Sequence, residues 1–201
     1  MENYSTSIAF TDIRRIPQEP EHVARPRRCY FRANAPLQFM TPEGKAFRLE
    51  TALEVKSLEG LLHQCNTRAL IDCGSKYRIV VHPEGQPKFA LQKSAQGRDA
   101  RGNALGKIAR QVAEVVEAYA DEMTQRAPGR NDSWRIGTGY IEFKDIYLLE
   151  LQQISLASFM PVLGISSLVS SNDEAMRITQ EMNFQMFGLD TCPGTQPYPV
   201  L

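Results

Sequence analysis

The chain has 201 residues, of which 42% are apolar and 23% are charged, and its formal net charge is zero. A chain of this length and apolar content can bury one core with appendages, which excludes an intrinsically disordered protein. Its four cysteines form no C-x-x-C pair, which indicates neither a disulfide framework nor a zinc ribbon, so we expect a reducing, cytoplasmic setting. The start of the chain, MENYSTSIAF, lacks the basic and apolar regions of a secretory signal.

The charge is divided unevenly along the chain. Residues 1–110 hold 18 of the 23 basic and 11 of the 23 acidic residues, a formal charge of +7, so residues 111–201 carry −7. This asymmetry predicts an acidic partner for the first half, or head-to-tail self-association in a homo- or hetero-oligomer. The alternative is that the two halves face each other within one fold.

The first 27 residues are predicted to form an extended arm, because three prolines there lack a backbone donor and disfavour helix. The stretch RRIPQEPEHVARPRRCYFR contains six arginines, a residue suited to bidentate phosphate contacts, and Tyr30 and Phe31 could stack on bases. An arm that docks on a neighbouring subunit would explain the same residues. The predicted anion-binding residues of the arm are Arg25, Arg27, Arg28 and Arg32.

The remainder of the first half is predicted to be a mostly antiparallel sheet. CYFRANAPLQFM and KAFRLETALEV flank a TPEG turn and read as a hairpin, and SLEGLLHQC follows as a short helix. RALIDC and KYRIVV are predicted to pair across Gly74-Ser75, and an HPEG turn leads into QPKFALQ.

The second half begins with the strongest pattern in the chain, a helix whose apolar residues recur at three- and four-residue steps until Pro128-Gly129. These residues are Leu105, Ile108, Val112, Val115, Val116, Tyr119 and Met123. GYIEFKDIYLLELQQISL returns to strand, and residues 151–172, although uncharged, are too polar to predict a membrane span. A capping box at Ser171-x-x-Glu174 predicts a last helix that ends at Gly188.

Taken in order, these elements predict an α+β fold with a mostly antiparallel sheet, one long amphipathic helix and a C-terminal helix. The core would be ferredoxin-like or an elaborated OB-like barrel. We expect a single domain over residues 28–188, followed by a tail over residues 189–201.

The segment KSAQGRDARGNALGKIARQ is the best candidate for an anion site. Its cations lie at the positive end of the long helix, against the preference of the helix dipole, where free backbone N–H groups could also face a phosphate. The alternative is a solvated basic loop. It is not a Walker A motif, because Arg101 and Ile108 replace the required glycine and hydroxyl residue. The candidate residues are Lys93, Arg98, Arg101, Lys107 and Arg110.

An enzymatic alternative comes from Glu43, Glu54 and Lys56, whose order resembles the acid…E-x-K pattern of restriction-endonuclease-like nucleases. In that family two acids bind magnesium and the lysine assists the attacking water. His63 with Cys65 and Cys73 lacks a fourth zinc ligand, so we expect no metal and no cofactor.

These patterns predict a non-enzymatic subunit of a larger assembly that contacts nucleic acid or an acidic partner, without a membrane, through the arm and the basic loop. Two alternatives are a metal-dependent nuclease and a self-assembling structural protein of a viral or sheath-like kind.

Overall fold

The structure is a computed structural model that describes residues 8–19, 34–69, 75–94, 103–127 and 132–167. The chain divides into two compact units, Met1–Ser167 and Leu168–Leu201, and every described residue belongs to the first. The predicted C-terminal helix, the tail and the predicted domain end at residue 188 lie outside the described residues.

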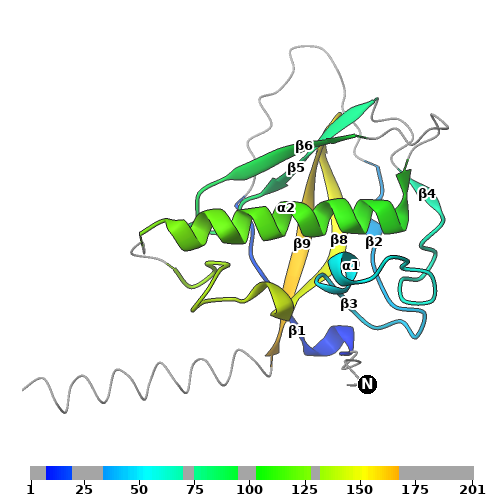
Figure 1. Cartoon of the computed structure of the whole chain (residues 1–201), viewed down its shortest axis with the longest axis horizontal. Coiled ribbons are helices and arrows are strands. Elements are labelled where there is room, and N and C mark those ends of the chain that lie inside the picture. Colours follow the sequence, from blue (N-terminus) through cyan, green and yellow to red (C-terminus); the bar gives the residue numbers. More distant parts are fainter. Residues whose placement is uncertain (1–7, 20–33, 70–74, 95–102, 128–131, 168–201) are drawn as a thin grey trace, which may run out of the picture. The chain divides into compact units, whose positions relative to one another are not determined.

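A seven-stranded mixed sheet is built around one long antiparallel hairpin, β8–β9 (Figure 1). The main strand order is β2-β8-β9-β5-β6, while β1 also pairs with β9 and β3 with β8. All pairings are antiparallel except that of β5 with β9. The strands are β1 (Ile13–Arg15), β2 (Leu37–Gln38), β3 (Phe47–Arg48), β5 (Lys76–Val81), β6 (Phe89–Ser94), β8 (Ile146–Ser155) and β9 (Ser158–Ser166).

The long helix α2 (Leu105–Gln125) packs against the sheet, and all seven apolar residues that predicted it are buried. Figure 1 shows it crossing β8 and β9, with β5 and β6 above it and the short helix α1 (Thr51–Glu54) below it. The long-helix prediction and the α+β class are therefore confirmed. The ferredoxin-like and OB-like cores stay predictions.

The smaller elements lie between these main ones. β4 (Arg68–Ala69) and β7 (Asn103–Ala104) form a separate two-stranded sheet immediately before α2. Two single-turn 3-10 helices, Phe10–Asp12 and Phe143–Asp145, precede β1 and β8.

The predicted hairpin around TPEG is partly right. Its turn closes between Thr41 and Lys45, with Gly44 at a φ of 72°, a conformation that glycine adopts without strain. The strand predicted after the turn is wrong beyond Arg48, because the chain forms the helix α1 at Thr51–Glu54 instead. Leu49 and Ala52 are both buried, and their three-residue spacing fits a helix and not a strand. The helix predicted over residues 57–65 is instead a series of turns.

The pairing predicted for RALIDC is also different in the structure. Its described residues form β4, which pairs with β7 rather than with β5. The HPEG turn is confirmed, because β5 and β6 pair continuously from Lys76↔Ser94 to Val81↔Phe89 around it.

Part of the predicted arm belongs to the sheet. β1 pairs with the end of β9, and Ile16, only 2% exposed, donates its N–H to the carbonyl of Leu163 at 2.9 Å. The N–H of Glu19 bonds the carbonyl of His82 at 2.8 Å. Residues 13–19 are therefore held by backbone pairing, whereas the four predicted arginines, at positions 25–32, lie outside the described residues.

The uncharged stretch that begins at residue 151 is, as far as residue 167, mainly the end of β8 and all of β9. Its apolar side chains alternate between the two faces of the central hairpin. Within the described ranges, no helix combines the length and the apolar character needed to cross a bilayer.

Candidate functional site

One end of the sheet brings together the β8–β9 turn, the start of β5 and the end of β6. The N–H of Arg78 in β5 bonds the carbonyl of Ala157 in the turn at 2.8 Å, and Lys76 pairs with Ser94 at the end of β6. We call this region, defined by Lys76, Arg78 and Leu156, the cationic end.

Lys76 and Arg78 project from the sheet face opposite α2. They alternate along β5 with Tyr77, which is 1% exposed and whose hydroxyl bonds Gln111 of α2. Both cations are exposed, and neither has an ion-pair partner in the part of the chain that the structure describes. They are therefore free to meet an anion.

One described end of each predicted basic segment lies in this region. Ser94 is the last described residue before Arg98 and Arg101. Asn34 is the first described residue after Arg32, and its N–H bonds the side-chain oxygen of Gln153 near the β8–β9 turn at 3.1 Å. Asn34 and Ser94, which are distant in sequence, thus both lie at this end of the sheet, whereas Glu19, before the arginines of the arm, bonds His82 beyond the other end of β5.

Two of the predicted anion-binding residues are engaged in the fold. Lys93 forms a 2.6 Å ion pair with Glu114 of α2. Arg110 donates to the carbonyls of Ala52, at 2.9 Å, and Val55, at 2.6 Å. Lys107, in the first turn of α2, is exposed.

The backbone donors at the start of α2 are also occupied. The N–H of Leu105 bonds the carbonyl of Thr67 at 2.9 Å, and the N–H of Gly106 bonds that of Cys65 at 2.8 Å. Two of the N–H groups that were expected to face an anion therefore donate instead to carbonyls of the loop before β4.

The three residues of the nuclease pattern lie on separate local features. Glu43 sits on the exposed tip of the TPEG turn, where a hydrogen bond with the Thr41 side chain lowers the pKa of its carboxyl. Glu54 ends α1 and Lys56 follows it, both exposed. Among the described residues, no group of three histidine, cysteine or acidic side chains is arranged to hold a metal ion.

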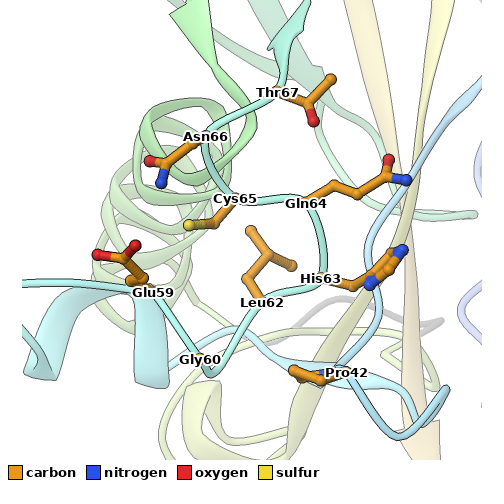
Figure 2. Close-up of a pocket in the computed structure, with 9 residues that line it drawn as sticks. All are labelled: Pro42, Glu59, Gly60, Leu62, His63, Gln64, Cys65, Asn66 and Thr67. Carbon is orange, nitrogen blue, oxygen red and sulfur yellow. The ribbon is translucent and has the colours of Figure 1, made fainter.

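A pocket of about 510 Å³ lies in the loop before β4 and contains His63 and Cys65 (Figure 2). The sulfur of Cys65 and the carboxylate of Glu59 are on one side of the loop, whereas the imidazole of His63 points to the other. The thiol and the imidazole are thus not arranged as a nucleophile and its base. Cys73, the third member of the predicted zinc set, lies outside the described residues.

A second pocket, of about 450 Å³, has an acidic lining. It lies beside the carboxyl-terminal half of α2 and includes Glu50, Glu117, Asp121 and Glu142, the last paired with Lys144 at 2.5 Å. Burial, and next the charge of the nearby Glu54, raise the pKa of Glu50. The acids on α2 could be read from the sequence, but their meeting with the residue 137–144 segment could not.

Sequence reasoning missed Lys76 and Arg78. The signal was present in KYRIVV, where the two cations alternate with a tyrosine and must share one face of a strand. Comparison with protein-family models, with curated proteins and with solved structures finds no match for this chain.

Proposed function

We propose that the protein is a non-enzymatic subunit of a larger assembly that binds nucleic acid through the cationic end. The observation that supports this proposal is the exposure of Lys76 and Arg78 beside one described end of each arginine-bearing segment. Cations from separate parts of the chain can thereby act on one polyanion.

Lys107 adds an exposed cation at the same end of the sheet, on the side of α2. Gln111, one helical turn later, donates its side-chain amide to the carbonyl of Ser94 at 3.2 Å. Side chains four residues apart on a helix are neighbours, so Lys107 lies about one turn from the end of β6. Lys93 and Arg110, in contrast, have structural partners and are not needed by the proposal.

We propose nucleic acid over an acidic protein as the partner because its phosphates form a continuous row of negative charge. Lys76 and Arg78 lie about 7 Å apart on one strand face, so both can bind phosphates of that row. A cytoplasmic setting belongs to the same proposal and is supported by the free thiol of Cys65. Oligomerisation also stays a prediction.

Fluorescence anisotropy with labelled oligonucleotides at several salt concentrations tests the proposal. The double variant Lys76→Ala, Arg78→Ala should weaken binding to all sequences, because phosphate contacts carry no base information. It should also reduce the slope of log affinity against log salt by about 1.4 for a single strand, at about 0.7 for each phosphate that is no longer neutralised.

The matched control is Arg126→Ala, which removes an exposed cation immediately after α2, at the opposite end of that helix from Lys107. This variant should bind as the wild type does. If the wild type fails to bind oligonucleotides even at low salt, the nucleic-acid proposal is wrong, and an acidic protein surface becomes the partner to seek.

A further inference from the structure

The turn between β8 and β9 carries a leucine that the fold leaves in solvent. Leu156 is 70% exposed, whereas the other two exposed large apolar residues of the described ranges, Phe10 and Leu61, are 39% and 41% exposed. A single exposed leucine is common in soluble proteins and by itself indicates no function. Its position beside the cations of the cationic end is the second observation.

Leu156 and Arg78 are held next to each other by the backbone. Ala157, which follows Leu156, accepts the N–H of Arg78 at 2.8 Å, and Arg78 is in register with Ser158. The start of β9 is thereby fixed to β5, so the apolar side chain and the cation are presented together. Asn34 and Gln153 stabilise the other flank, because the amide of Gln153 also donates to the carbonyl of Leu156 at 3.2 Å.

The two kinds of side chain suit two different parts of a nucleic acid. Lysine and arginine bind phosphates, whereas an aliphatic side chain, which has no hydrogen-bonding group, packs against the apolar faces of bases. In a duplex the bases are stacked and paired, and an apolar residue reaches them only by unstacking a step, which costs a few kcal/mol. In a single strand the faces of the bases are already accessible.

We propose that the cationic end prefers single-stranded nucleic acid, with Lys76 and Arg78 on successive phosphates and Leu156 against an unpaired base. This inference rests on the proposed function and specifies its ligand. The contact is tolerant of sequence, because every base offers an apolar face and no hydrogen-bonding group takes part.

The experiment compares three variants on two probes, a thymine-only single strand of about 12 nucleotides, within the range of known single-strand sites, and a duplex of equal length. Anisotropy should show the wild type binding the single strand up to about fivefold more tightly than the duplex, because only the single strand gains the contact with Leu156. Leu156→Ala should weaken single-strand binding about fivefold, as expected when a leucine side chain is no longer buried in the complex, and leave the salt slope unchanged.

Lys76→Ala, Arg78→Ala should instead reduce the salt slope, which separates the apolar contact from the phosphate contacts. The control is Leu61→Ala, which removes an exposed leucine from the loop before β4 and should change neither affinity nor slope. All substituted residues are on the surface, and circular dichroism of each variant checks that the fold is retained.

The outcomes distinguish this inference from the proposed function. Equal binding of the two probes, or an unaltered affinity in Leu156→Ala while the double variant weakens binding, overturns the single-strand inference and leaves nucleic-acid binding in place. A duplex preference that depends on Leu156 overturns it as well, in favour of a wedge inserted between base pairs. If the wild type binds neither probe, both proposals fall.

Discussion

Arg110 offers a sharp test of how this fold uses its basic residues, because the sequence assigns it to an anion and the structure gives it carbonyl partners. Its guanidinium bonds the carbonyls of Ala52, Val55 and Lys56 at 2.9, 2.6 and 3.2 Å. These carbonyls belong to the last turn of α1 and the residues that follow it, where a helix has no internal donors. The expected role of Arg110 is therefore to hold α1 against α2.

The cost of Arg110→Ala can be worked out from these hydrogen bonds. A hydrogen bond to a charged group contributes about 1.5–3 kcal/mol, and three bonds from one guanidinium are not additive. Arg110 is half-buried, so water can replace part of what the substitution removes. We expect a decrease of about 2 kcal/mol in the free energy of unfolding, which at a urea m-value of about 2 kcal/mol/M lowers the midpoint by about 1 M.

Urea unfolding can be followed by the fluorescence of Trp134, the only tryptophan, which is packed against the core. The matched control is Lys107→Ala, an exposed cation one turn earlier, which should change the stability by less than about 0.5 kcal/mol. In the anisotropy assay the roles should reverse, with Lys107→Ala reducing the salt slope by about 0.7 and Arg110→Ala leaving it unchanged. A stability decrease below about 0.5 kcal/mol for Arg110→Ala, or a salt slope reduced as much as in Lys107→Ala, would refute the structural role.

Two further predictions concern groups at the ends of the helices. Arg135, 4% exposed, donates to carbonyls at the end of α2 and pairs with Asp132 at 3.6 Å, so Arg135→Ala should cost about 3–5 kcal/mol in urea unfolding. Arg126→Ala, which removes only an exposed pair with Glu122, should cost less than about 1 kcal/mol, and equal costs for the two variants would contradict this reasoning. Burial and the charge of Glu54 raise the pKa of Glu50, so ionisation of this carboxyl destabilises the fold as the pH rises. Glu50→Gln should therefore increase the melting temperature at pH 7, and this gain should vanish below the ordinary carboxyl pKa. A gain that does not change with pH would show that the charge of Glu50 is not its cause.

The sequence was most informative where local pattern and tertiary packing agree. The spacing of the apolar residues of α2 puts them on one face of a helix, and the structure buries that face against the sheet. The HPEG turn could be predicted for a similar reason, because it joins two strands that are neighbours both in the chain and in the sheet.

The elements that were missed depend on partners distant in the chain. β4 is too short to specify its own pairing, and its partner β7 lies beside the start of α2, with Arg68 opposite Ala104. The parallel contact of β5 with β9 joins Arg78 to Ser158, a separation that no local pattern encodes. Long-range pairing of this kind follows from the whole fold.

The basic segments of the candidate site could be predicted from the sequence, but the partners of their individual cations could not, because those partners are distant in the chain. Counting cations locates the basic segments but does not tell which cations are already bound. Lys93 finds Glu114 at a sequence separation of 21, and Arg110 finds Ala52 at 58. The structure removes these two residues from the candidate site because their partners lie in the fold, and it adds Lys76 and Arg78, which the sequence pattern of β5 could have indicated.

The opposite charges of the two halves of the chain have two consequences in the structure. Some cations meet acids within the fold, as Lys93 does with Glu114 and Arg15 with Glu150 at 3.4 Å. This contact between the halves is the alternative that the charge pattern left open, and it leaves less charge for head-to-tail association.

The charges left at the surface are separated along α2, with Lys107 in its first turn and Asp121 of the acidic pocket 14 residues later. At 1.5 Å per residue these two positions are about 21 Å apart along the axis, more than twice the Debye length of about 8 Å at physiological salt. A polyanion at the cationic end is therefore screened from the acidic pocket under those conditions. At about 0.01 M salt the Debye length grows to about 30 Å, so the acids then oppose binding, and the gain in affinity on lowering the salt should become smaller than the slope near physiological salt implies.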